Sequence, residues 1–104
     1  MAKDKLGVPQ SLSRESAAIY EQTITTNRMD DAMGRAVLLV ALEALDRLRE
    51  AQKILKREGL TCRDRNGVVR PHPCTVIERN SRSAFLAAFR ALGIEAPAVP
   101  KVPR

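Results

Sequence analysis

Residues 59–97, GLTCRDRNGVVRPHPCTVIERNSRSAFLAAFRALGIEAP, contain the signals that decide the fold. The pair Asn66-Gly67 lies between two short extended runs. This pair is typical of a two-residue type I′ turn, which needs positive φ at both positions. A β-hairpin is therefore predicted at about 61–70. Pro73 suits the first turn of a helix, where its missing N–H costs nothing, and Gly93 is a typical helix end. The stretch predicts a hairpin followed by a helix from Pro73 to Leu92.

This last helix carries apolar residues at helical spacing, which predict its buried face. Ile94, after the terminating glycine, is expected to supply the hydrophobic contact that accompanies such helix ends. The residues assigned to the buried face are Val76, Ile77, Ala84, Ala88 and Leu92, with Phe85 and Phe89 beside them.

The clearest helix in the sequence precedes the hairpin. Asn27 is a good N-cap, and Asp30 and Asp31 would lie in the first turn, where the helix dipole favours anions. Cations gather in the last turns, and Gly59 follows as the stop signal, with Leu60 available for the contact beyond it. The cations of the last turns are Lys53, Lys56 and Arg57. The pattern predicts a helix about 40 Å long at 1.5 Å per residue, in which Gly34 costs about 1 kcal/mol relative to alanine.

A heptad-like row of apolar residues runs along this long helix. The row is wider than one packing partner requires, because Leu39, Val40 and Leu42 add apolar surface beside it. The first helix can cover one part, and either the last helix or another subunit must cover the rest. The candidate oligomer-interface residues are Leu38, Ala41, Leu45, Leu48 and Leu55, with Gln52 in the same row.

The rest of the chain completes one small domain. Ser11 or Ser13 can cap a first helix that ends near Asn27, with a stripe formed by Leu12, Ala17, Tyr20 and Ile24. With 104 residues and three aromatic side chains, the core must be built from aliphatic residues, which favours packed helices. We predict a mainly α fold: a helical hairpin with a long central helix, a short β-hairpin and a C-terminal helix, assembling as an oligomer. The domain spans 11–96, between a flexible arm (1–10) and an extended basic tail (97–104).

Positive charge is concentrated in the C-terminal part of the chain. Residues 60–104 hold eight basic and three acidic groups, a net +5 of the total +6. Such a segment indicates a polyanionic partner, above all nucleic acid; the alternative is a basic surface that serves only solubility. With few aromatic residues for base stacking, backbone contact with strong salt dependence is expected. The candidate DNA-binding residues are Arg63, Arg65 and Arg70 on the hairpin, Arg79 and Arg82 on the last helix, and Lys101 and Arg104 on the tail.

Catalytic, metal and membrane functions find little support in the residues. The single histidine, His72, stands without a nucleophile motif, and there is no P-loop. Cys62, His72 and Cys74 lack the close ligand pairs of a structural zinc site, so two buried thiols and a capping histidine are the better interpretation. No cofactor is expected. No stretch reaches the ~18 apolar residues of a membrane span, and the polar N-terminus and two cysteines suggest a cytosolic protein with free thiols.

The order of these elements resembles the small subunit of phage terminase, from about Leu12 to Pro97. The resemblance rests on the long helix that ends in KREGL (56–60), the hairpin around Arg65-Asn66-Gly67, His72-Pro73 before a helix, and Leu92-Gly93-Ile94 before Pro97. The family often has asparagine where this chain has His72, and the connector around 25–31 lacks its Leu-Thr-x-x-Asp pattern.

The resemblance implies a non-catalytic component of viral genome packaging in the host cell cytoplasm. Such proteins assemble as homo-oligomeric rings, bind double-stranded phage DNA and deliver it to the terminase large subunit, which carries the ATPase and nuclease. Two alternatives remain open: a small dimeric DNA-binding regulator, for which Asn80, Ser81 and Arg82 could read bases, and a structural helical adaptor with no role on DNA.

Overall fold

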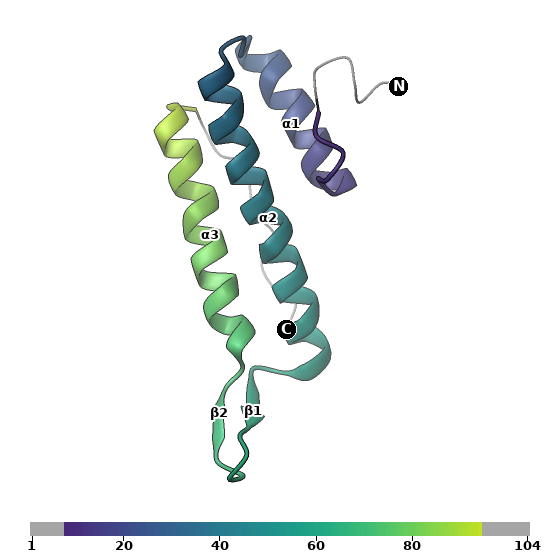
Figure 1. The fold of residues 1–104 in the computed structure, drawn as a ribbon, viewed down its shortest axis with the longest axis vertical. Coiled ribbons are helices and arrows are strands. Elements are labelled where there is room, and N and C mark those ends of the chain that lie inside the picture. The colour runs from purple at the N-terminus through teal and green to yellow at the C-terminus, as the bar shows by residue number, and fades with distance from the viewer. Residues whose placement is uncertain (1–7, 95–104) are drawn as a thin grey trace.

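A computed structural model describes residues 8–94 as three helices and a two-stranded hairpin (Figure 1). The order is α1 (Arg14–Asn27), α2 (Ala32–Glu58), β1 (Thr61–Arg63), β2 (Val69–Pro71) and α3 (Pro73–Leu92). The helices α2 and α3 pack along each other in opposite directions, and α1 lies against the N-terminal half of α2. The predicted mainly α class is confirmed, as are the bounds of α1 and α3 and the C-terminal end of α2.

The connection from α1 to α2 differs from the prediction. Asn27 is the last residue of α1, and Arg28 follows in the left-handed region (φ 48°). Met29, which is buried, then donates its N–H to the carbonyl of Ile24 across the helix end (3.0 Å). Asp31 rather than Asn27 is the N-cap of α2, because Arg28 has already turned the chain away from the axis of α1.

Gly34 has a specific place in this second cap. The Asp31 carboxylate accepts the N–H of Gly34 at 2.7 Å. A Cβ at position 34 would lie 2.9 Å from both carboxylate oxygens, closer than such atoms approach. Glycine therefore lets the carboxylate reach the helix N-terminus, which offsets its lower helix propensity.

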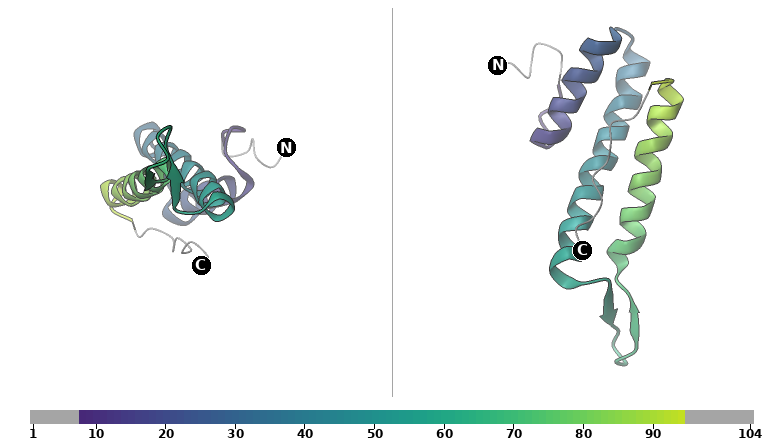
Figure 2. Two further views of the ribbon diagram at one scale, coloured as in Figure 1. Left: turned by 90° about the horizontal axis from the view of Figure 1, so that it is seen from below. Right: turned by 180° about the vertical axis from the view of Figure 1, so that it is seen from behind.

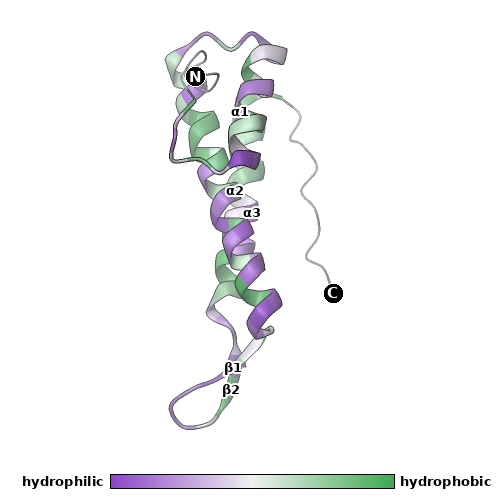
Figure 3. Ribbon diagram, turned by 90° about the vertical axis from the view of Figure 1, so that its right-hand side faces the viewer, coloured by the Kyte–Doolittle hydropathy of each residue, from purple (hydrophilic) through white to green (hydrophobic). Residues whose placement is uncertain are grey.

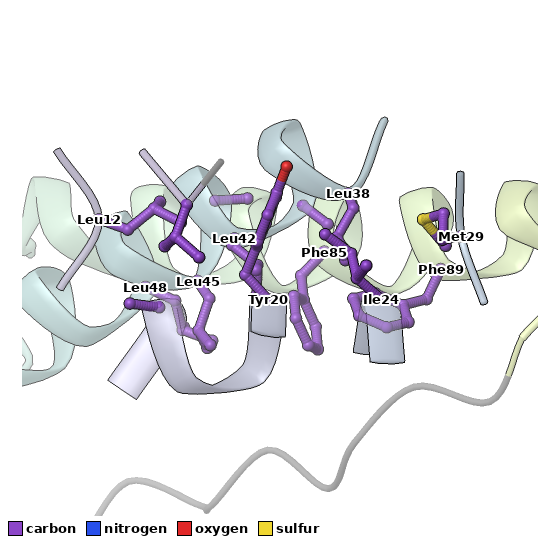
Figure 4. Packing of buried hydrophobic residues seen from close by; sticks show 14 residues of the cluster. Leu12, Tyr20, Ile24, Met29, Leu38, Leu42, Leu45, Leu48, Phe85 and Phe89 are labelled. Atoms are coloured by element: carbon purple, nitrogen blue, oxygen red, sulfur yellow. The ribbon is translucent and has the colours of Figure 1, made fainter. Parts of the chain in front are cut away.

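The main core lies where all three helices meet (Figure 4). Leu38 and Leu45 of α2 lie among Tyr20 of α1 and the aromatic rings of α3. The rings of Phe85 and Phe89 are 5.0 Å apart between centroids and tilted by 49°, a favourable arrangement for an aromatic pair. A smaller cluster of Ala51, Leu55 and Cys74, with Ile54 against it, continues between α2 and α3 toward the hairpin.

This packing corrects the predicted oligomer interface. The five residues assigned to it are 0–4% exposed within the single chain, because α1 and α3 together cover the whole apolar row of α2. A second copy could reach them only if the chain opened. The residues are Leu38, Ala41, Leu45, Leu48 and Leu55.

The buried face of α3 is also rotated from the prediction. Val76 and Ile77 are 46% and 44% exposed, and Ala84 is exposed as well. The helix instead buries Cys74, Ser81, Phe85 and Phe89, while Ala88 and Leu92 are half-buried beside them. Aromatic side chains bury the largest area, so the helix orients with both rings at the centre of the contact.

The N-terminal segment is packed from its first described residue. Val8 is 4% exposed and joins the core with Leu12, so residues 8–10 do not belong to a flexible arm. The rest of the predicted arm and the predicted tail, with Lys101 and Arg104, lie outside the described residues.

Candidate nucleic-acid interface

The β-hairpin projects beyond the ends of α2 and α3 (Figure 2), and its tip is hydrophilic (Figure 3). In its register Thr61 pairs with Pro71, Cys62 with Arg70, and Arg63 with Val69. No residue of the two strands or their loop is fully buried. Leu60 is exposed too, so the hydrophobic contact predicted beyond Gly59 is absent from the described residues.

The turn of the hairpin is wider than the predicted type I′ turn. Gly67 has positive φ (79°) but Asn66 does not. Gly67 donates its N–H to the Asp64 carbonyl (2.9 Å), and the N–H of Asp64 donates to the Val68 carbonyl (3.0 Å), the pattern of a three-residue loop with a bulge. The Asp64 carboxylate explains this choice, since it accepts the N–H groups of both Asn66 and Val68.

His72 joins the hairpin to the helices. Its Nδ1 accepts the N–H of Cys74 (3.0 Å) as the N-cap of α3, and its Nε2 lies 2.9 Å from Oε1 of Glu58 at the end of α2. These two contacts define the neutral ring with the proton on Nε2, which donates to Glu58. That hydrogen bond, followed by the effect of Arg57, lowers the pKa of the Glu58 carboxyl. The capping histidine is confirmed, and Cys74 is buried, whereas Cys62 is only half-buried.

We expect His72→Ala to reduce the free energy of unfolding by about 1–2 kcal/mol, because it removes the buried capping hydrogen bond to Cys74 and the partly buried contact with Glu58. His72→Asn should recover more than half of this loss, since its amide oxygen can take the place of Nδ1. His72→Gln reaches toward Glu58 without a good capping geometry and serves as the matched comparison. Urea denaturation checks the series; an asparagine variant as unstable as the alanine variant would refute the capping role.

The three hairpin arginines differ in the ion pairs and hydrogen bonds that they form with other groups of the hairpin. Arg70 forms an ion pair with Asp64 at 2.7 Å and, as the largest of several causes, lowers the pKa of that carboxyl. Arg63 donates to the Gly67 carbonyl at 2.9 Å, and no carboxylate pairs with it or with Arg65 within the described part of the chain. Because strand residues alternate between faces, Arg63 and Arg70 point to opposite sides of the hairpin.

The arginines of α3 share one flank of that helix. Arg79, Arg82, Leu86 and Arg90 follow at steps of three, four and four. Arg82 is half-buried, and its guanidinium lies 3.6 Å from Glu78, whose Oε2 is buried and accepts no hydrogen bond in residues 8–94. Arg79 is exposed and forms no ion pair there. Of the two predicted α3 residues, Arg79 is therefore the freer to meet a phosphate.

A row of cations on α2 was not identified from the sequence as part of the candidate site. The lysines near the end of this helix were explained there only by their favourable interaction with the helix dipole. Arg49 reaches Glu15 of α1 through both its Nε and an Nη nitrogen (2.9 Å each). Lys53 and Lys56 follow at steps of four and three, on the same face but beyond the first turn of α1. Both lysines are exposed. Their spacing from Arg49 was the available signal, but only the short length of α1 shows that the row is uncovered.

The molecule is electrically asymmetric as a result. Residues 49–82, which form the hairpin and the adjoining halves of α2 and α3, hold nine basic and four acidic groups, a net +5. The other described residues hold five basic and six acidic groups, a net −1. The fold thus brings Arg63, Arg65, Arg70, Arg79 and Arg82 to one end together with the α2 lysines. We call this end the basic end.

The chemistry available at the basic end is binding of an anion. Guanidinium and ammonium groups donate to phosphate oxygens, and separated cations on a rigid support match a polyphosphate better than one small anion. Residues 8–94 contain no group of three or more side chains placed to hold a metal ion. Within the same range, no helix has the length and apolar character needed to cross a bilayer. Comparison of the chain with protein-family models, curated proteins and solved structures finds no match.

Proposed function

We propose that this protein binds double-stranded DNA through its basic end, as the non-catalytic small subunit of a phage terminase. The observation that supports DNA binding most directly is the net +5 of residues 49–82, with exposed cations on α2, on the hairpin and on α3. A duplex presents two rows of phosphates, and a projecting hairpin beside two helix ends can contact more than one of them. Binding is expected to be weakly sequence-specific, since phosphates carry no base identity.

Delivery of the DNA to a large ATPase and nuclease subunit, within a homo-oligomeric ring in the host cytoplasm, completes this proposal. It rests on the resemblance of the element order. A ring would have to assemble through surfaces other than the apolar row of α2, which is used inside the chain.

Arg79→Glu/Arg82→Glu is expected to weaken duplex binding at least about tenfold and to lower the salt dependence of binding by about 0.9 for each phosphate that the variant no longer neutralises. Arg14→Glu/Arg28→Glu, at the first residue of α1 and at the residue that follows the helix, makes the same change in net charge and is the matched control. Fluorescence anisotropy with a labelled duplex at several salt concentrations measures both effects. Equal losses in the two variants would show that only net charge matters, and absence of wild-type binding at low salt would overturn the proposal in favour of an adaptor.

A dimeric DNA-binding regulator is the second candidate function. It is favoured by the exposed apolar side chains that α2 and α3 carry outside their core contact, among them Met33, Val40 and Ile77. The two functions differ in assembly, so the mass of the particle in solution separates them: assembly that stops at two chains indicates the regulator, and a larger closed ring, which pairs could build through a further surface, indicates the packaging component.

A further inference from the structure

The flank of α3 opposite to its arginines is apolar and exposed. Ile77, Ala84 and Ala91 lie seven residues apart, so they form one row along the helix. Ile77 is 44% exposed, and both alanines are exposed. The sequence assigned Ile77 and Ala84 to the core, yet the core formed by Phe85 and Phe89 leaves them outside. An apolar row therefore remains uncovered in the described structure.

A second row, largely apolar and partly exposed, lies next to it on α2. Met33, Val37, Val40 and Ile54 share one face of that helix, and the exposed Arg47 lies in the same row between Val40 and Ile54. Met33 and Val40 are 74% and 54% exposed, whereas Val37 and Ile54 are half-buried. The two rows meet at a groove of about 410 Å³, which Met33 and Val37 line together with Ala91. Because the helices run antiparallel, the rows continue side by side toward the hairpin, where Ile54 packs against a cluster that includes Cys74 of α3. The combined surface is called here the α2–α3 face.

The α2–α3 face is complementary to itself. Ala84 lies midway between Ile77 and Ala91, so a two-fold axis at Ala84 sets the large Ile77 of each copy opposite the small Ala91 of the other. Ala84 meets its own copy at the axis, where a small side chain lets two helices approach closely.

One pair of charges fits the same arrangement: Arg47 lies within the α2 row, and Glu43 lies one turn before it at the edge of the row. At the level of that axis the two α2 helices would run antiparallel, which would bring Arg47 of each copy near Glu43 of the other. Arg47 and Glu43 are exposed and form no ion pair within residues 8–94. Opposite charges that meet within a largely apolar contact favour one register over its alternatives.

The size of the face suits a weak to moderate pair. The α2 row from 33 to 54 spans about 30 Å at 1.5 Å per residue, and two packed helices are about 20 Å wide. The contact would bury about 1,200 Å² over both copies, at the lower limit of stable interfaces. Dissociation in the micromolar range is therefore expected.

We infer that a second copy of this chain packs on the α2–α3 face about a two-fold axis at Ala84, forming a bundle of four helices. The contact leaves the arginine flank of α3 and the lysine row of α2 on the outside of the pair. It does not rest on DNA binding, and either function proposed above can accommodate it.

Ala84→Glu tests this contact, because it brings two like charges together at the axis. Glutamate is a good helix former, so the isolated chain should keep its fold. The dissociation constant of the pair, from sedimentation equilibrium over a concentration series, should rise at least tenfold. Ser83→Glu makes a similar change at the preceding exposed position, pointing away from the face, and should leave the constant unchanged. Circular dichroism confirms the helical content of both variants.

A cross-link provides a second measurement. In a Cys62→Ser background, Ala84→Cys should form a disulfide-linked dimer in air, and Ser83→Cys should not. A wild-type protein that is monomeric throughout the series, or an Ala84→Glu variant that assembles as the wild type does, would overturn the inference. DNA binding is measured separately on each variant. Loss of binding by Arg79→Glu/Arg82→Glu with the pair intact leaves the inference standing, and absence of wild-type DNA binding refutes only the proposed function.

Discussion

Replacing Phe85 with alanine is expected to lower the free energy of unfolding by about 3–5 kcal/mol, the largest effect of any single substitution considered. The side chain is completely buried; its ring pairs with that of Phe89 and belongs to the same core cluster as the buried leucines of α2. Truncation removes the transfer free energy of a whole ring and leaves a cavity where the helices meet. Because small domains have about 5–15 kcal/mol of stability in total, the variant should be near its unfolding threshold.

Urea denaturation followed by circular dichroism measures this loss. Leu86→Ala changes the neighbouring residue, which is partly exposed on the arginine flank, and is expected to cost under about 1 kcal/mol. Phe85→Leu should lie between the two, since it keeps much of the apolar volume. A cost below about 1 kcal/mol for Phe85→Ala would mean that α3 does not form the core contact described.

Asp46→Ala is expected to cost about 2–3 kcal/mol and to loosen the start of α1. The Asp46 carboxylate accepts hydrogen bonds from the backbone N–H of Ser13 (3.0 Å), from its hydroxyl (2.6 Å) and from the hydroxyl of Ser16 (2.5 Å). Ser13 is itself the N-cap of α1, and Ser16 is fully buried. Removal of the acceptor leaves the buried Ser16 hydroxyl with only the Leu42 carbonyl at 3.4 Å and takes the anchor from the exposed Ser13 cap, although the ion pair of Glu15 with Arg49 remains.

A double-mutant cycle distinguishes the hydrogen bonds between Asp46 and the two serines from a general effect of the substitution on α2. In a Ser13→Ala/Ser16→Ala background, Asp46→Ala should cost about half as much, because only the backbone N–H of residue 13 is then deprived of its acceptor. Hydrogen exchange should become faster in α1 and stay unchanged in the α2–α3 core. Equal costs in the two backgrounds would show that Asp46 acts independently of the serine hydroxyls.

Signals that act over a few residues were read correctly from the sequence. Ser13, Pro73 and Gly93 begin or end helices as predicted, since each acts on backbone groups within one turn. Asn27 failed as the cap of α2 because Asn27 and Asp31 are both competent caps. The choice between them depends on Arg28 adopting positive φ and on Met29 entering the core.

The candidate site was predicted in part for a similar reason. The arginines of the hairpin and α3 are close in sequence, so their grouping could be foreseen. Lys53 and Lys56 join them only because α1 leaves them uncovered. The first turn of α1, which contains Glu15, lies beside Arg49, and the helix covers only the turns of α2 that precede these two lysines. That coverage depends on the packing of α1, which no local pattern of α2 contains.

By itself the sequence determined the element order, most helix ends and the location of the positive charge, because capping, turn formation and charge are properties of neighbouring residues. The tertiary structure alone decided which apolar rows are covered. Periodicity shows that a helix has an apolar face but not what packs on it. In α3, two neighbouring faces were apolar enough to be the buried one. The packing of Phe85 and Phe89 against α2 decided which face of α3 is buried. It buries the predicted oligomer-interface residues of α2 within the single chain and leaves Ile77 and Ala84 exposed.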